Sequence, residues 1–252
     1  MVCAFTFSAQ AEAKAGNLKN RALLIGVSDY SDTCTYGDLS FCHKDAFDMR
    51  DMLVEQYGWK SNDIKVLVNE SATEANIIAG IDWLKKATGT TVFYFSGHGD
   101  FYADVQAIPN GDEPRDQCII PYDGDTGTME HLMIDDAMIG YFEGMNAQAT
   151  VLIFDSCYSG GMIDELGTEG RMILSSCLYN EMCWEGGTKQ IPFENGVYTY
   201  CLLQAFDGAG DVDGDGMVSL DEAAAYAEDH VGDYTRQVTP ITYDGISGET
   251  YL

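Results

Sequence analysis

Positive charge is scarce in this sequence. Its 13 Lys and Arg residues stand against 41 Asp and Glu, which gives a formal net charge of −28 at pH 7. A surface of this kind repels nucleic-acid phosphates and anionic membranes. The composition therefore argues against nucleic acid as a partner and favours cations, basic peptides and metal ions. Long apolar runs are also missing, because no stretch reaches the roughly 18 residues that a membrane-spanning helix requires.

Zinc-type cysteine patterns and domain linkers are missing as well. The eight cysteines include no Cys-x-x-Cys pair and no Cys/His spacing typical of a zinc site. No Ser/Pro/Gly-rich linker, internal repeat or low-complexity tract divides the 252 residues. With 46% hydrophobic residues the chain can bury one sizeable core. We therefore predict one domain over residues 21–252, acting as a monomer.

The first 20 residues have a separate character. An apolar patch at Val2–Phe7 leads into Ala9, Ala11 and Ala13, which together resemble an Ala-x-Ala cleavage site. The positively charged start of a signal peptide is missing. Residues 1–20 are therefore either the remnant of an export signal or a disordered terminus. An exported location and a cytoplasmic one both stay open.

Short apolar runs alternate with amphipathic segments along the chain. This alternation predicts an α/β domain with a mostly parallel central sheet and helices on both faces. The predicted strands are residues 21–27, 64–68, 91–95, 150–154 and 171–176. The predicted helices are residues 44–57, a segment capped by Ser71 or Thr73 that runs to Lys86, and residues 222–231.

Two reactive side chains follow predicted strands directly. His98 comes just after the strand at 91–95, and Cys157 just after the strand at 150–154. The carboxyl ends of parallel strands meet at one edge of a sheet, where ligands bind, so we expect these residues to meet. A thiol attacks a carbonyl as thiolate, and an imidazole can take its proton and later return it to the leaving amine. No third orienting residue is evident, so the sequence predicts a Cys–His dyad.

Glycines surround both reactive residues. Gly97 and Gly99 flank His98, and their lack of a side chain lets the backbone approach a substrate closely. Attack on a carbonyl creates an oxyanion that needs backbone N–H donors. We predict that the amides of Gly99 and Cys157 form this oxyanion hole.

The segments around these residues resemble a known family. FSGHG at Phe95–Gly99 and DSCYSGG at Asp155–Gly161 are similar to the catalytic blocks of the caspase-like clan of cysteine peptidases. The resemblance is closest to metacaspases and to bacterial and archaeal caspase homologues. The stretches RALLIGVSDY, LSFCHKDAFDM and DQCIIPYDGD occur in the order of that family, so the resemblance covers the chain from Arg21 onward. It implies a caspase-haemoglobinase fold and endopeptidase activity.

The resemblance also implies a substrate preference. Metacaspases cleave after Arg or Lys through an acidic pocket, so protein or peptide substrates with Arg or Lys at P1 are the expected partners. Asp45 and Asp155 match the two pocket aspartates, and Cys42 and Ser96 match residues that line the pocket. Phe41 stands where the family usually has Gly, and we expect the larger side chain to narrow the site.

An acidic segment near the C-terminus predicts a calcium site. Residues 211–222 fit the EF-hand calcium loop position by position, with Gly216 at the sharp turn and a predicted helix following. The alternative is an acidic turn that caps this helix without metal. The expected ligands are Asp211, Asp213, Asp215, the Met217 carbonyl, Ser219 through a water, and Glu222.

A second calcium site follows from the resemblance alone. Calcium-dependent metacaspases bind the ion beside the substrate groove through aspartates, and the matching positions are Asp116, Asp135, Asp136 and Asp164. Residues 125–132 form an insertion relative to the family that would reshape this region. The expected cofactor is Ca²⁺, and we expect it to raise activity.

Two rival functions and one modification complete the expectations. A clostripain-like or legumain-like peptidase of the same clan is the rival enzyme, and a calcium-binding interaction module with little peptidase activity is the rival from another class. Self-cleavage is expected at Lys189, in the segment 186–190, which we expect to be an exposed loop. Arg171 is the poorer candidate because it starts a predicted buried strand.

Overall fold

The computed structural model describes residues 18–103, 115–236 and 238–252 of the chain. The expectation of an export remnant or disordered terminus therefore falls almost entirely outside the described residues. Within these ranges no helix is both long enough and apolar enough to cross a membrane.

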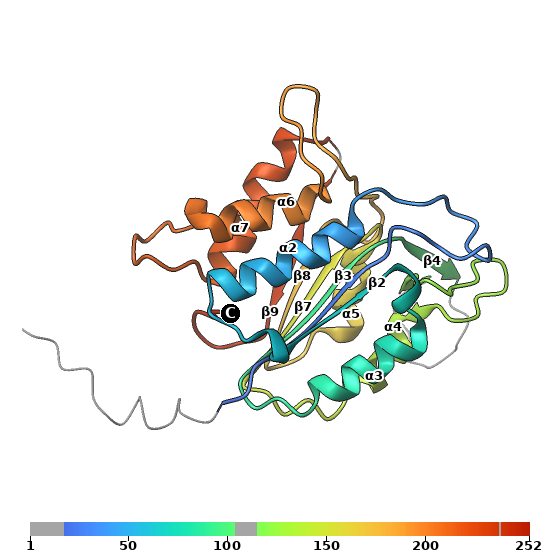
Figure 1. Ribbon diagram of the computed structural model, residues 1–252, viewed down its shortest axis with the longest axis horizontal. Coiled ribbons are helices and arrows are strands. Elements are labelled where there is room, and N and C mark those ends of the chain that lie inside the picture. The colour runs from blue at the N-terminus through green and yellow to red at the C-terminus, as the bar shows by residue number, and fades with distance from the viewer. Residues whose placement is uncertain (1–17, 104–114, 237) are drawn as a thin grey trace, which may run out of the picture.

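A six-stranded sheet forms the centre of the molecule (Figure 1). Its strand order is β2-β1-β3-β7-β8-β9, and all neighbours are parallel except β9, which runs antiparallel to β8. In that order the strands are Ile64–Val68, Arg21–Gly26, Thr90–Ser96, Ala149–Asp155, Arg171–Ser175 and Ile241–Asp244.

Helices cover both faces of this sheet (Figure 1). On one face lie α2 (Cys42–Glu55), α6 (Val197–Gln204) and α7 (Leu220–His230); on the other lie α3 (Glu74–Leu84), α4 (Asp135–Phe142) and α5 (Met162–Leu166). Short helical turns occupy Ser61–Asp63, Asn69–Ser71, Ser159–Gly161, Ala205–Ala209 and Val231–Asp233.

The two helical layers explain why the central strands are apolar throughout. Alternate residues of a strand point to opposite faces, and here each face meets a helix. Leu24 and Tyr94 pack with α2, α6 and α7, whereas Leu23 and Phe93 pack with α3, α4 and α5. All seven residues of β7 are buried. This sandwich holds the strand ends rigidly at the edge where β3 and β7 finish.

A small antiparallel sheet begins where β3 ends. Its strands β4 (Gly99–Ala103), β5 (Arg115–Ile119) and β6 (Met133–Ile134) pair in that order. The Ile120 amide donates to the His98 carbonyl oxygen at 3.0 Å, which continues the pairing back to the end of β3. The small sheet therefore starts directly after His98, the residue whose side chain was expected to act as base.

The expected α/β class is confirmed. The five predicted strands occur with bounds that agree to within a residue. Thr73, rather than Ser71, caps α3, because its Oγ1 accepts from the Asn76 amide at 3.3 Å. Helix α6, the small sheet and the antiparallel edge strand β9 were not predicted from the apolar pattern.

Candidate active site

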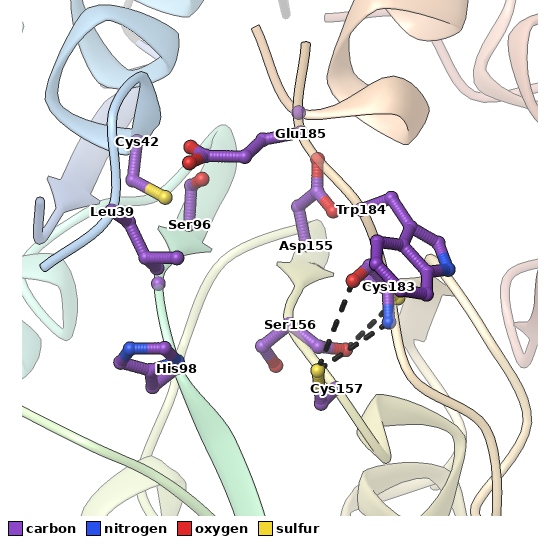
Figure 2. A pocket seen from close by; sticks show the side chains of 12 residues that line it. Leu39, Cys42, Ser96, His98, Asp155, Ser156, Cys157, Cys183, Trp184 and Glu185 are labelled. Carbon is purple, nitrogen blue, oxygen red and sulfur yellow. Dashed lines mark hydrogen bonds between the residues drawn. The ribbon is translucent and has the colours of Figure 1, made fainter. Parts of the chain in front are cut away.

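Strand register brings the two reactive side chains together. β3 and β7 are neighbours, and Ser96 at the end of β3 pairs with Asp155 at the end of β7. His98 and Cys157 each follow two residues later, so both emerge at the same level of the same edge. They line one pocket of about 310 Å³, and Figure 2 shows them near each other at one end of it. The register of the sheet thus explains why His98 and Cys157 line the same pocket.

Three groups from the loop after β1 hold His98. Its Nε2 contacts the Gly37 carbonyl oxygen at 2.7 Å, and its backbone N–H donates to the Tyr30 hydroxyl at 2.7 Å. The Tyr36 ring lies 5.4 Å away, centroid to centroid. Because a carbonyl can only accept, Nε2 carries the hydrogen and Nδ1 is left as the basic nitrogen. The orienting group that the sequence did not reveal is therefore a backbone carbonyl.

Burial shapes the protonation of the reactive pair. Burial raises the pKa of the Cys157 thiol to about 11, although a hydrogen bond from the Cys183 amide to Sγ, 3.4 Å long, opposes this. Burial also lowers the pKa of His98 below its usual 6.5. The free protein consequently holds a neutral thiol and a neutral imidazole near pH 7. A thiolate at Cys157 would therefore have to form by proton transfer, and His98 is the imidazole that lines the same pocket.

The loops that carry the two reactive residues touch at Gly99. A Cβ atom placed on Gly99 would lie 2.2 Å from the Cys157 carbonyl oxygen and 3.0 Å from the Ser156 Oγ. The missing side chain at position 99 is thus required by the neighbouring loop itself, beyond any approach of substrate. Immediately after the nucleophile, Tyr158 adopts φ +62°, a left-handed turn whose amide donates to the Glu181 carbonyl oxygen at 2.8 Å.

Two buried carboxylates underlie the other end of the pocket. Asp45, from α2, accepts from Ser96 Oγ at 2.7 Å and from Asn195 Nδ2 at 2.9 Å. Asp155 accepts from the Thr199 amide at 3.0 Å and from the Thr199 hydroxyl at 2.7 Å. Burial, reinforced by the neighbouring carboxylate, raises the pKa of Asp45 well above its usual range, and burial raises that of Asp155 to about 6.

Three of the four predicted pocket residues line the cavity. Cys42, Ser96 and Asp155 face it, whereas Asp45 is completely buried behind Ser96. Phe41 was expected to narrow the pocket, but it does not belong to the described lining, and its ring instead lies near Gly186. The extra bulk at position 41 is accommodated outside the cavity.

Sequence reasoning missed one whole wall of the pocket. Cys183, Trp184 and Glu185 line it from the irregular segment between β8 and α6. Trp184 is 55% exposed at the rim, and both carboxylate oxygens of Glu185 accept from the backbone amides of Ser40 and Phe41, just before α2. This segment has no periodic pattern, so only its contacts in the fold reveal its place.

The EF-hand-like loop gathers three of its predicted ligands. One carboxylate oxygen from each of Asp211, Asp213 and Asp215 lies within 4.8 Å of the others, and Gly216 makes the turn at φ +90°. The Glu222 Oε2 accepts from the Ser219 amide at 2.9 Å and hydroxyl at 3.0 Å, in a capping box for α7, and its Oε1 accepts from the Val212 amide of the loop at 3.0 Å. The three aspartates therefore fit a cation, and Glu222 contacts both the loop and the start of α7. The Met217 side chain is half exposed beside them.

The four aspartates of the second expected calcium site lie on neighbouring elements. Asp116 in β5 and Asp135 at the start of α4 are buried, Asp136 is half-buried, and Asp164 in α5 is exposed. Asp135 accepts from the Gln117 amide at 2.9 Å. Within the described part of the chain, the only group of three or more potential ligand side chains that converge is the trio in the EF-hand-like loop. The four aspartates share a region without converging on one point.

Comparisons with known proteins identify the family. The model described as "Metacaspase, peptidase C14 domain" matches residues 20–166, more than half of the chain. The chain belongs to the metacaspase family of cysteine peptidases. The resemblance noted from FSGHG and DSCYSGG is confirmed.

Curated metacaspases from a fungus and a plant are similar to more than half of this chain. Metacaspase-1 of Cryptococcus neoformans is 31% identical over 156 residues, which are 58% of this chain and 33% of the relative. Metacaspase-6 of Arabidopsis thaliana is 32% identical over 157 residues, covering 59% of this chain and 40% of the relative. The chain thus spans about a third of the length of these relatives.

A solved structure supports the fold over almost the whole chain. The crystal structure of a Geobacter sulfurreducens protein aligns with a TM-score of 0.65 at 18% identity, covering 91% of this chain and 94% of that one. At this identity the likeness concerns the fold alone. It extends beyond the residues matched by the family model, into the part that holds α6, α7 and β9.

Proposed function

We propose that this metacaspase is a cysteine endopeptidase that cleaves after Arg or Lys, with Cys157 as nucleophile and His98 as general base. The observation that carries this proposal is the pairing of Ser96 with Asp155, which places both reactive residues in one pocket. A calcium-binding module without activity would have no need of an imidazole oriented by the Gly37 carbonyl beside a thiol.

The chemistry follows from the two side chains. As the substrate carbonyl enters, His98 Nδ1 takes the Sγ proton and the thiolate attacks the carbonyl carbon, forming a C–S bond. The oxyanion is stabilised by the amides of Gly99 and Cys157. His98 then returns the proton to the leaving amine as the peptide bond breaks. Water, deprotonated by His98, hydrolyses the resulting thioester and restores the thiol.

The acidic end of the pocket supports a basic P1 side chain. Removing a guanidinium or ammonium group from water is costly unless anionic partners replace the solvent. Asp155 lines the cavity, and Ser96 links the cavity to the buried Asp45. A substrate Arg or Lys would enter between Cys42 and Asp155, where its charge is compensated.

Calcium control is part of the same proposal. Asp116, Asp135, Asp136 and Asp164 would hold an ion that orders the loops beside the groove, and this ion would raise activity. Asp211, Asp213 and Asp215 would hold a second ion that stabilises the start of α7. Calcium accepts six to eight oxygens in flexible geometry, so it suits such loops better than magnesium, which demands a tight octahedron.

A cleavage profile tests the proposal directly. Purified protein is treated with EDTA and assayed on a peptide library, with and without added calcium or magnesium, and Cys157→Ala serves as the blank. We expect cleavage after Arg and Lys that increases with calcium. A preference for Asp at P1 would contradict the assigned specificity, and full activity in EDTA would contradict calcium control.

A further inference from the structure

Glu185 occupies the wall of the pocket opposite the sheet. Its backbone pairs with Gly196 in an isolated antiparallel bridge, which fixes the segment against the start of α6. Its Oε1 accepts from the Ser40 amide at 2.7 Å and its Oε2 from the Phe41 amide at 2.9 Å. Both oxygens are therefore held in place before any substrate arrives.

The held carboxylate faces the residues that line the acidic end. Figure 2 shows the Glu185 side chain reaching across the pocket, with its oxygens close to Ser96 and Cys42. Burial is the main influence on the pKa values of Cys42, His98 and Asp155, and the charge of Glu185 acts on all three in the direction that raises them. Glu185 thus belongs electrostatically to the pocket, although it comes from a segment distant in sequence from both reactive residues.

The two aspartates are less available to a substrate than Glu185. Asp45 is completely buried and already accepts from Ser96, Asn195 and Gly196. Burial favours its neutral form, as its raised pKa indicates. Asp155 lines the cavity but is 5% exposed, and one of its oxygens is taken by Thr199.

Glu185, in contrast, has capacity to spare. A carboxylate has about four acceptor positions, and each Glu185 oxygen receives one backbone amide. The side chain is partly exposed to the pocket, and among the described residues no Lys or Arg forms an ion pair with it. A carboxylate that is held in place, partly exposed and not paired with a described Lys or Arg is well prepared to receive a cation.

We infer that Glu185 contacts the P1 cation of the substrate together with Asp155, and that Asp45 acts behind them as a positioning residue through Ser96. The inference rests on the proposed cleavage after Arg or Lys and specifies which carboxylates meet the charge. Two carboxylates on different walls suit the planar guanidinium, whose five N–H donors can engage both, better than the compact ammonium of Lys. Arg is therefore the preferred P1 residue.

Citrulline, a neutral isostere of Arg, shows whether Glu185 recognises the charge of the P1 side chain or only supports the wall of the pocket. Matched peptides carrying Arg or citrulline at P1 are cleaved by wild type, by Glu185→Gln and by Glu194→Gln, an exposed glutamate of the same segment. Loss of a charge-assisted contact should lower kcat/KM for the Arg peptide roughly 10- to 100-fold in Glu185→Gln, mainly through KM. The citrulline peptide should change little, and Glu194→Gln should behave as wild type for both.

The outcomes distinguish failure of the role inferred for Glu185 from failure of the proposed peptidase function. If wild type cleaves after neither Arg nor Lys, the proposed function fails. If wild type cleaves after Arg but Glu185→Gln lowers both peptides equally, Glu185 only supports the wall and the inference alone is overturned. Should Glu185→Gln fail to fold, Glu185→Asp keeps the charge but withdraws it by one methylene. An Arg-to-citrulline ratio unchanged in that variant would also overturn the inference.

Discussion

Two acidic groups on this molecule are built in opposite ways. The pocket carboxylates (Asp45, Asp155 and Glu185) come from three distant parts of the chain, and two of them are buried with raised pKa values. The loop carboxylates, those of the aspartates at 211, 213 and 215, come from five consecutive residues and lie largely at the surface. The first group is assembled by the fold, whereas the second is assembled by local turns.

The difference sets what each group can do. A charge held in a buried pocket is costly and therefore selective for a partner that neutralises it. Exposed carboxylates in a local loop cost little and can be served by an ion or by water. Changes in the pocket should therefore alter catalysis and specificity, and changes in the loop should alter stability.

The largest effect is expected at the nucleophile. Cys157→Ala removes the attacking sulfur with little change in volume, so activity should fall by more than about 10³-fold while the melting temperature hardly moves. His98→Ala should come close to this. Cys34→Ala, a partly exposed thiol outside the pocket, is the control. Near-normal turnover by Cys157→Ala would contradict the assignment of this pocket as the active site.

Calcium activation gives the next contrast. Asp135→Asn combined with Asp136→Asn should abolish the rise in activity across a calcium titration, because the groove loops lose two oxygens of their expected ion site. Asp213→Asn combined with Asp215→Asn should keep the activation. If instead the second pair abolishes it, the loop carboxylates control the rate and the contrast between the two regions collapses.

The preference of the pocket for a charged P1 side chain should depend on pH. Burial raises the pKa of Asp155 to about 6, so above this pH the carboxylate is charged and would attract a basic P1 side chain, whereas below it the neutral carboxyl would not. The ratio of kcat/KM for Arg to that for citrulline should therefore fall as pH decreases through this range, since kcat/KM reports the free enzyme. Protonation of His98 affects both peptides and cancels from the ratio. A flat ratio would mean that Asp155 does not meet the cation.

A smaller effect is expected on stability. Calcium that binds the folded loop, but not the unfolded chain, should raise the melting temperature by a few degrees at saturating concentration. Asp213→Asn with Asp215→Asn should lose this increment, measured by calorimetry with and without EDTA. An identical calcium shift in wild type and variant would indicate that α7 is capped without metal.

The smallest effect is self-cleavage. Lys189 is exposed in the segment that continues from the pocket wall, whereas Arg171 is half-buried at the start of β8. Intact mass after prolonged incubation should show a slow cut after Lys189 that is absent from Cys157→Ala. Lys189→Gln should prevent the cut without changing cleavage of peptides. Equal masses for aged wild type and Cys157→Ala would reject self-cleavage.

The sequence predicted what is encoded locally. Continuous apolar runs gave the strands, and the residues directly after β3 and β7 gave His98 and Cys157, because neighbouring parallel strands finish at one edge. The turn of the Asp-rich loop was predictable because its residues are consecutive in the sequence. The contacts of the Gly37 carbonyl and of Glu185 could not be predicted. A backbone group has no sequence signature, and the segment between β8 and α6 that carries Glu185 has no periodic pattern of apolar residues. Burial of Asp45 behind Ser96 likewise depends on tertiary packing.

The close approach of the Gly99 backbone to the Cys157 carbonyl oxygen means that the segments carrying the proposed base and nucleophile are spaced by direct contact. A single added methyl group at position 99 would act as a wedge and push one catalytic loop away from the other. The two halves of the active site therefore cannot be redesigned separately, because a graft that carries only one loop also loses the surface that sets its distance. The space between the two loops at Gly99 is therefore too small for one additional carbon atom.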